Sequence, residues 1–267
     1  MSEFASRAIT SNQTGIHADI PALVAKYWQH EFLKPVAAHS KAAFAQVAER
    51  LASFNGPLIL DSCCGVGEST AELAQRYPQA LVVGIDKSAH RLSKHVFHKK
   101  ASEHCGEYML VRADLNDFWR LAAAAKWQPE RHFLLYPNPW PKKKHLGRRW
   151  HGAPVFPAFV QLGGMIELRS NWPIYVGEFA LALACVGITA EVRQLPEQVE
   201  PITPFERKYQ ASGQSLWQLT ANLAGANLVA PENIEYLAQR AAELAESGEG
   251  VLKSAARNFA LGDARGA

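Results

Sequence analysis

The sequence predicts an α/β fold built around a doubly wound, mostly parallel sheet of seven strands, with an N-terminal helical extension. Short apolar runs alternate with helix-length segments across residues 57–223, a pattern typical of parallel strands joined by crossover helices. A glycine turn follows the first of these runs, at the place where such folds bind nucleotides. With 267 residues, 48% of them hydrophobic, the chain can bury the core of one large domain with appendages.

The segment before the sheet is predicted to hold an arm and two helices. Residues 1–18 are polar and show no period, which predicts a flexible arm. Helices are expected at 19–33 and 39–53, because a Lys-Pro pair separates them and an Asn-Gly-Pro turn stops the second.

The rest of the chain divides into the sheet region and a tail. Strands are expected at 58–60, 81–85, 108–111, 132–136, 165–168, 188–195 and 216–223. Helices are expected at 67–77, 88–103, 115–126, 173–186 and from 231 to about 246. The predicted divisions are an arm with helices (1–56), a core (57–223) and a C-terminal helix and tail (224–267).

Charge and cysteine content narrow the class of protein. The net charge of +3 is too small to prove a nucleic-acid partner, so the position of the charge matters, and it clusters at 142–149. The four cysteines form neither a metal-ligand spacing nor a secreted disulfide framework, so we expect no metal and a cytoplasmic location. The longest apolar run, 179–190, is too short to span a bilayer, and we expect no export signal or membrane partner.

A buried strand, a glycine turn and a helix start follow one another over residues 58–70. Gly65 and Gly67 let the backbone approach a ligand, and the N–H groups at the helix start favour polar or anionic ligand groups. Asp61 and Asp86 end the first two strands, so both carboxylates are expected at the crevice above the sheet. Thr70 stands where a dinucleotide fingerprint requires Gly or Ala, which disfavours NAD.

The spacing Asp61-x-x-x-Gly65-x-Gly67 resembles the first motif of the class I methyltransferases. The resemblance implies a Rossmann-like sheet and S-adenosyl-L-methionine as cofactor. It places the first acid at the methionine amino group, the acid after the second strand at the ribose, and the acid after the third strand at the adenine. The cofactor-binding residues implied in this way are Asp61, Gly65, Gly67, Asp86, Lys87, Asp114, Leu115 and Asn138.

Residues 136–150 contain a proline-aromatic turn followed directly by the basic cluster. Three prolines within five residues fix φ and bar regular helix or central strand there. The turn offers an aromatic face for stacking on a base, and the cluster offers five Lys and Arg side chains for phosphates. This combination predicts contact with single-stranded or looped nucleic acid.

The same segment resembles the Pro-Asp-Pro-Trp-x-Lys-x-x-His-x-x-Arg-Arg signature of the bacterial tRNA (guanine-N7)-methyltransferases. Residues 170–172, Ser-Asn-Trp, and 203–206, Thr-Pro-Phe-Glu, resemble two later segments of that family, and the resemblance covers roughly 57–219. It implies methylation of a tRNA guanine at N7, with Asn138 as the catalytic candidate beside the methyl group. The substrate-binding residues implied are Trp140, Lys142, Lys143, Lys144, His145, Arg148, Arg149, Asn171, Thr203 and Glu206.

The chain departs from this family at Asn138 and Asn171, where the family carries carboxylates. Guanine N7 attacks through a lone pair and loses no proton, so positioning can replace a general base. The alternatives are an exocyclic-amine base methyltransferase, whose Asn-Pro-Pro-aromatic loop differs in register, a small-molecule methyltransferase, and an RNA-binding homologue weakened in catalysis. The expected partner is tRNA or another structured RNA, and the expected state is a monomer or homodimer.

Overall fold

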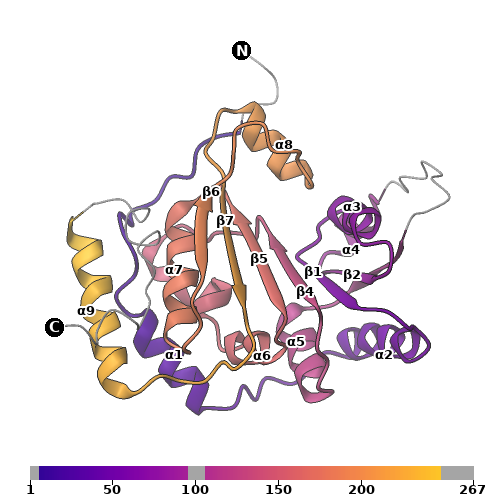
Figure 1. Ribbon diagram of the computed structural model, residues 1–267, viewed down its shortest axis with the longest axis horizontal. Coiled ribbons are helices and arrows are strands. Elements are labelled where there is room, and N and C mark those ends of the chain that lie inside the picture. The colour runs from indigo at the N-terminus through magenta and orange to yellow at the C-terminus, as the bar shows by residue number, and fades with distance from the viewer. Residues whose placement is uncertain (1–5, 96–105, 248–267) are drawn as a thin grey trace.

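A seven-stranded sheet forms the centre of the protein, as the computed structural model of residues 6–95 and 106–247 shows (Figure 1). The strand order is β3-β2-β1-β4-β5-β7-β6. The first five strands of that order pair in parallel, and β7 runs antiparallel to both β5 and β6. The strands are β1 (Leu58–Ser62), β2 (Leu81–Asp86), β3 (Glu107–Arg112), β4 (Arg131–Leu135), β5 (Met165–Ser170), β6 (Glu191–Gln194) and β7 (Trp217–Asn222).

Helices of very different lengths connect the strands. Two short 3-10 helices, η1 and η2, lie between β4 and α6. The helices are α1 (Ile20–Gln29), α2 (Ala38–Ala52), α3 (Glu68–Arg76), α4 (Ala89–Leu92), α5 (Leu115–Ala124), η1 (Lys143–Arg148), η2 (Trp150–Gly152), α6 (Phe156–Gln161), α7 (Pro173–Ala184), α8 (Pro204–Ala211) and α9 (Pro231–Ser247).

The two faces of the sheet are covered unequally, because successive strand residues point to opposite sides. Leu58 and Leu60 face a large core packed by α1, α2, α5, α6, α7 and α9, whereas Ile59 faces a smaller core packed by α3 and α8. Figure 1 shows β6, β7 and β5 facing the viewer without a covering helix among the described residues. The face left open there carries polar side chains such as Arg193 and Glu167.

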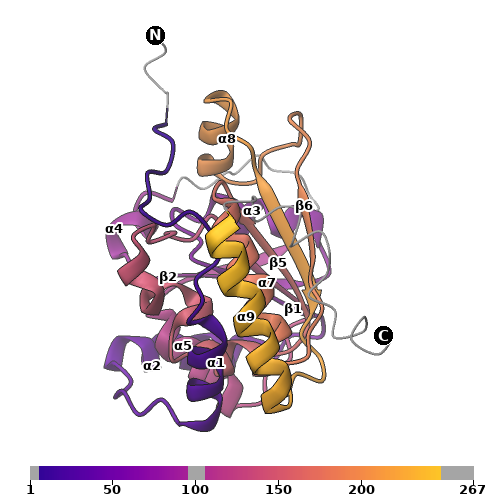
Figure 2. The same cartoon turned by 90° about the vertical axis from the view of Figure 1, so that its left-hand side faces the viewer.

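The N-terminal and C-terminal helices lie together on the outside of the large core. Figure 2 shows α9 beside α1, with α7 behind them, and α1 also contacts α6 and η2. The arm before α1 descends from the neighbourhood of α8 toward α1 in both views (Figures 1 and 2). Within the described part of the chain, no helix is long and apolar enough to cross a membrane.

The predicted fold class is confirmed, with seven strands in a mostly parallel sheet, and the structure adds that β7 is the antiparallel strand. The helix expected at 88–103 is wrong in extent, because α4 ends at Leu92 and residues 96–105 lie outside the described residues. The flexible arm is also corrected over residues 6–17, because the Ser6 N–H donates to Ser212 Oγ and Gln13 Nε2 donates to Glu178 Oε1. The helices α6 and α8 were not predicted. The division of the chain at 56 and 223 stays a prediction.

Candidate active site

The carboxyl ends of the five parallel strands meet at one edge of the sheet, and the predicted site residues lie there. Asp61 and Ser62 of β1 pair with Gly84 and Ile85 of β2, and Leu135 of β4 pairs with Arg169 of β5. The loops that leave these strands therefore begin side by side. They carry the glycine turn after β1, the acids after β2 and β3, and the proline loop after β4.

The glycine turn adopts left-handed backbone angles and leaves space above it. Gly65 has φ +62° and Gly67 has φ +79°, a region that side chains rarely adopt. A Cβ on Gly67 would lie 2.6 Å from Leu110 Cδ1, whereas a Cβ on Gly65 would meet no atom of the described residues within 4 Å. The backbone angle favours glycine at position 67, and Gly65 opens onto a space in which a ligand can approach the backbone.

Asp61 is fully buried beneath that turn with only one of its carboxylate oxygens satisfied. Its Oδ2 accepts hydrogen bonds from Ser69 Oγ and Thr70 Oγ1, both at 2.7 Å. Its Oδ1 has no hydrogen-bond partner among the described residues. Burial raises the pKa of Asp61 to about 6, although the two hydroxyl bonds act in the opposite direction. A cation placed at Oδ1 would satisfy this oxygen and favour the ionised form.

Asp86 ties the glycine turn to the end of β2. Its Oδ2 accepts from the backbone N–H of Gly65 and from Arg91 Nη1, each at 3.1 Å, and its Oδ1 accepts from the Ser88 N–H at 2.8 Å. Lys87, predicted beside it at the ribose, is exposed. Asp86 is buried and both of its carboxylate oxygens have partners, so it shapes the turn at the end of β2.

Asp114 caps the start of α5, where its Oδ1 accepts from the Asn116 N–H at 2.9 Å. Burial alone would raise its pKa, but the hydrogen bonds from Asn116 and the charges of Lys34 and Lys87 lower it below the usual value. The side chain of Leu115 lies in the core, so only its backbone can face a ligand.

The loop after β4 holds Asn138 outside the sheet. Tyr136 and Trp140 both have positive φ, +50° and +46°, which is strained backbone for large side chains. Asn138 is exposed, and its Oδ1 accepts from the Trp140 N–H at 3.2 Å. Because the amide oxygen accepts from the Trp140 N–H of its own loop, the Nδ2–H₂ group points away from that bond.

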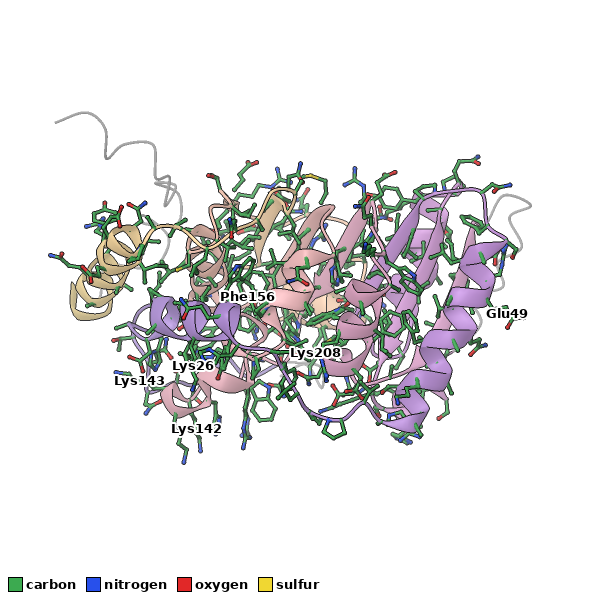
Figure 3. The ribbon with its side chains drawn as sticks, turned by 90° about the horizontal axis from the view of Figure 1, so that it is seen from below. Lys26, Glu49, Lys142, Lys143, Phe156 and Lys208 are labelled. Atoms are coloured by element: carbon green, nitrogen blue, oxygen red, sulfur yellow. The ribbon has the colours of Figure 1, made fainter. Side chains whose placement is uncertain are left out.

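Four of the five predicted cations project outward from this loop. Lys142, Lys143, Lys144 and Arg148 are exposed, and Figure 3 shows Lys142 and Lys143 directed away from the body. Arg148 stacks on Trp140 with 4.8 Å to the ring centroid, and His145 meets the same ring edge-on at 5.7 Å. Loss of solvation, followed by the Arg148 and Lys144 charges, lowers the pKa of His145.

The prediction that Arg149 contacts substrate is wrong, because this side chain is fully buried. Its Nη1 donates to Glu178 Oε2 at 2.5 Å, and its Nε and Nη2 donate to the carbonyl oxygen of Trp140 at 3.3 and 3.1 Å. Nη2 also donates to the oxygens of Gln13 and Lys142. An uncompensated guanidinium in the interior is costly, so its partners hold it there. Arg149 fastens the loop from inside.

The predictions for Thr203 and Glu206 as substrate contacts are also corrected. Thr203 is buried as the N-cap of α8 and accepts from the Glu206 N–H at 2.9 Å. Glu206 is fully buried, where its Oε1 accepts from Tyr136 Oη at 3.0 Å and Arg169 Nη1 at 2.6 Å, and its Oε2 accepts from the Ile202 N–H. Both carboxylate oxygens are occupied, so Glu206 joins α8 to β4 and β5.

Asn171 lies at the end of β5 and is half-buried. Its Nδ2 donates to Gln214 Oε1 at 2.8 Å, and Gln214 Nε2 donates to the carbonyl oxygen of Ser6 at 3.0 Å. The predicted substrate residue thus reaches the N-terminal arm through one intermediary.

Residues 55–219, more than half of the chain, match the family model Methyltransf_4, described as "Putative methyltransferase". The chain belongs to this methyltransferase family. The family and the fold are those of S-adenosylmethionine-dependent methyltransferases.

Three curated relatives of this chain share the name tRNA (guanine-N(7)-)-methyltransferase. The protein of Treponema pallidum (strain Nichols) is 26% identical over 166 residues, which cover 61% of this chain and 66% of the relative, just under two thirds of its length. Those of Thiobacillus denitrificans and Alkalilimnicola ehrlichii are 26% and 29% identical, covering 67% and 61% of this chain and 77% and 71% of the relatives.

Among solved structures, the 16S rRNA methyltransferase KamB superposes with a TM-score of 0.50. Its sequence is 19% identical, and the superposition covers 71% of this chain and 96% of that chain. This likeness supports the class I Rossmann-like architecture.

Several buried polar residues of this chain were not predicted as part of the site. Glu178 lies in the middle of α7, in a run of apolar residues, and Gln13 lies in the arm. A single acid inside an otherwise apolar helix was the signal that a buried cationic partner exists. Gln13 carried no comparable signal, because isolated polar residues are ordinary in an arm.

Proposed function

We propose that this chain transfers a methyl group from S-adenosyl-L-methionine to RNA, and that the acceptor is a guanine N7 of tRNA. The Asn138 amide carries the proposal, because its oxygen accepts from the Trp140 N–H and its exposed Nδ2–H₂ group can donate to a base at the carboxyl end of the sheet. The shared name of the curated relatives supports the same acceptor.

The glycine turn and the strand-end acids fit the cofactor. The unpartnered, buried Oδ1 of Asp61 would accept from the amino group of the methionine moiety, and the space over Gly65 admits the ligand against the backbone. Asp86 and Asp114 would contact the ribose and the adenine end, with Lys87 and the Leu115 backbone beside them. Bound S-adenosyl-L-methionine supplies an electrophilic methyl group on a sulfonium.

Asn138 selects between two acceptor chemistries. Guanine presents two adjacent acceptors, N7 and O6, on one edge. The Nδ2–H₂ group of Asn138 would donate to O6 and direct N7 at the methyl group, and no proton has to leave. An exocyclic amine would instead require acceptors for its hydrogens, and the Oδ1 of Asn138 is turned to the Trp140 N–H. The amide therefore supports N7 methylation over the amine alternative.

The outward cations would hold the RNA backbone. Lys142, Lys143, Lys144 and Arg148 lie on one exposed surface next to Trp140, and the Arg148–Trp140 stack offers a flat platform for a base. Arg149 supports this surface from below by donating to the carbonyl oxygens of Trp140 and Lys142.

The deciding experiment incubates the protein with labelled S-adenosyl-L-methionine and RNA from a strain that lacks this gene, followed by nucleoside mass spectrometry. We expect one additional 7-methylguanosine in tRNA. A methylated exocyclic amine would favour the amine alternative, and transfer only to metabolites would favour a small-molecule enzyme. Cofactor and RNA binding without any new methylated nucleoside would leave an RNA-binding homologue and remove the proposal.

A further inference from the structure

A pocket of about 750 Å³ opens between the N-terminal arm and the basic loop. Residues 10–12 and His17 line one side, and Lys142, Lys143 and Lys144 line the other. Its volume lies in the range of pockets that hold small ligands, so it exceeds the needs of a lone ion. The lining side chains are hydroxyls, an amide, an imidazole and three ammonium groups, which together favour an anion.

Direct hydrogen bonds join the two walls of this pocket. Asn12 Oδ1 accepts from the Lys143 N–H at 3.1 Å, and Ser11 Oγ donates to the carbonyl oxygen of Pro141. Neighbouring residues of the arm therefore bond to different residues of the basic loop, so the two segments are joined at more than one point.

A buried cluster behind the pocket fixes both walls to α7. Gln13 of the arm donates from Nε2 to Glu178 Oε1 at 2.5 Å and accepts at Oε1 from Arg149 Nη2 at 3.0 Å. The same carboxylate receives Arg149 Nη1 and His151 Nε2 on its other oxygen. Burial would raise the pKa of Glu178, but its hydrogen bonds to His151 and Gln13 and the Arg149 charge lower it below its usual value. A charged residue on α7 thus holds the arm and the loop together.

We propose that this pocket binds the phosphates of the RNA strand next to the acceptor nucleotide, and that the N-terminal arm forms half of that site. The inference rests on the proposed function for the identity of the polyanion. Trp140 and Lys142 are two residues apart on the same loop, so phosphates in the pocket would lie beside a base held at Trp140. The arm contributes uncharged hydroxyl and amide groups to the pocket, whereas additional lysines there would repel the three lysines of the loop.

The test changes one charge without removing a hydrogen bond. Asn12→Asp keeps an oxygen that accepts from the Lys143 N–H and adds a carboxylate to the pocket. The matched control is Asn222→Asp at the end of β7, because Asn222 is also exposed and its Oδ1 also accepts a backbone N–H, that of Ala224 at 3.0 Å. Asn222 stands at the opposite edge of the sheet, where it pairs with Met165 at the start of β5.

Binding of tRNA from the gene-deleted strain is measured by filter retention across a salt series, with S-adenosylhomocysteine binding measured in parallel. We expect Asn12→Asp to weaken tRNA binding about fivefold at low salt and to reduce the salt slope by about one. Asn222→Asp should change the dissociation constant less than twofold, and cofactor affinity should stay the same in both variants.

Equal RNA affinities of the two variants would overturn the arm site, and so would a loss of cofactor affinity in step with RNA. The methyl-transfer assay of the unchanged protein tests the proposed function separately from the arm site. Transfer to tRNA together with normal RNA binding by Asn12→Asp would refute the arm site alone. RNA binding that responds to Asn12→Asp without any transfer would keep the arm site and refute the proposed reaction.

Discussion

Replacing Asp61 by Asn separates the two roles that the buried carboxylate has in the proposed cofactor site. An amide oxygen in place of Oδ2 still accepts from Ser69 and Thr70, so the glycine turn keeps its support. The negative charge that would face the amino group of the cofactor is lost. A hydrogen bond to a charged group contributes about 1.5–3 kcal/mol, so we expect cofactor binding at pH 7 to weaken by roughly 10- to 100-fold.

The same substitution is expected to stabilise the cofactor-free protein. Burial raises the pKa of Asp61 from its usual 3.8 to about 6, so its contribution to stability is present at low pH and is lost as pH rises through about 6. That shift corresponds to about 3 kcal/mol above pH 6, since one pKa unit is 1.36 kcal/mol. Asn carries no such cost, and Asp61→Asn should therefore unfold at a higher temperature than the unchanged protein at pH 7 but not at pH 4.

Calorimetric titration with S-adenosylhomocysteine between pH 5 and 8 measures the binding effect. Affinity of the unchanged protein should rise about tenfold per pH unit up to about pH 6 and then level, because the ionised carboxylate binds the ammonium. Asp61→Asn should give a weak, flat profile. Asp117→Asn is the control, since Asp117 is also buried and accepts a backbone N–H, that of Ala37, but lies on α5. Equal affinities for Asp61→Asn and Asp117→Asn would refute the reasoning.

Three further predictions concern the loop and its support. Glu178→Gln should lower the free energy of unfolding by about 3–5 kcal/mol in chemical denaturation at pH 7, because Arg149 is left unpaired in the interior. Since the pKa of Glu178 lies below its usual 4.5, the difference between the two proteins should disappear only in acid. Equal denaturation midpoints at pH 7 would contradict the role of the buried cluster. Arg148→Ala should weaken RNA binding and reduce the salt slope of the binding constant by about one, while the melting temperature stays unchanged. Arg149→Ala should instead lower the melting temperature, because this side chain is buried. The reverse pattern would contradict the burial of Arg149. Asn138→Ala should reduce kcat/KM for tRNA about tenfold through loss of one hydrogen bond. Asn138→Asp should raise KM but increase kcat, because a carboxylate stabilises the positive charge that grows on the purine. Unchanged steady-state constants in both variants would remove Asn138 from the acceptor site.

The sequence predicted the sheet well because its strands are buried on both faces or alternate clearly, as in β1 and β2. The short elements were harder. In α6 the residues Phe156–Gln161 form a single apolar turn and a half, too short for a helical period to show. The first turn of α8 was visible only as a capping pattern, in which Thr203 accepts from Glu206, and the motif reading assigned those two residues to substrate.

The site was predictable at the level of strand ends and unpredictable at the level of side-chain direction. Asp61, Asp86 and the glycine turn follow from where parallel strands end. By contrast, Arg148 and Arg149 are identical in type and adjacent in sequence, yet one stacks on the surface and the other enters the interior. The 3-10 turn of η1 places them on opposite sides, and the buried partner Glu178 is 29 residues further along the chain. The lone acid in α7 indicates a buried cationic partner, but the sequence around residues 148 and 149 does not show which of the two arginines that partner is.

The two amides at positions where the resemblance implies carboxylates have different environments in this structure. Asn171 donates from Nδ2 to Gln214 Oε1, which leaves the Nε2 of Gln214 to donate to the Ser6 carbonyl oxygen of the arm. A carboxylate at position 171 would require Gln214 to turn its amide, and the Gln214 oxygen would then face the Ser6 oxygen. The amide at 171 is therefore coupled to docking of the arm, whereas the amide at 138 is exposed on the loop after β4. If the arm forms half of the RNA site, the change at 171 acts on substrate binding from a distance, and only the change at 138 acts at the methyl acceptor itself.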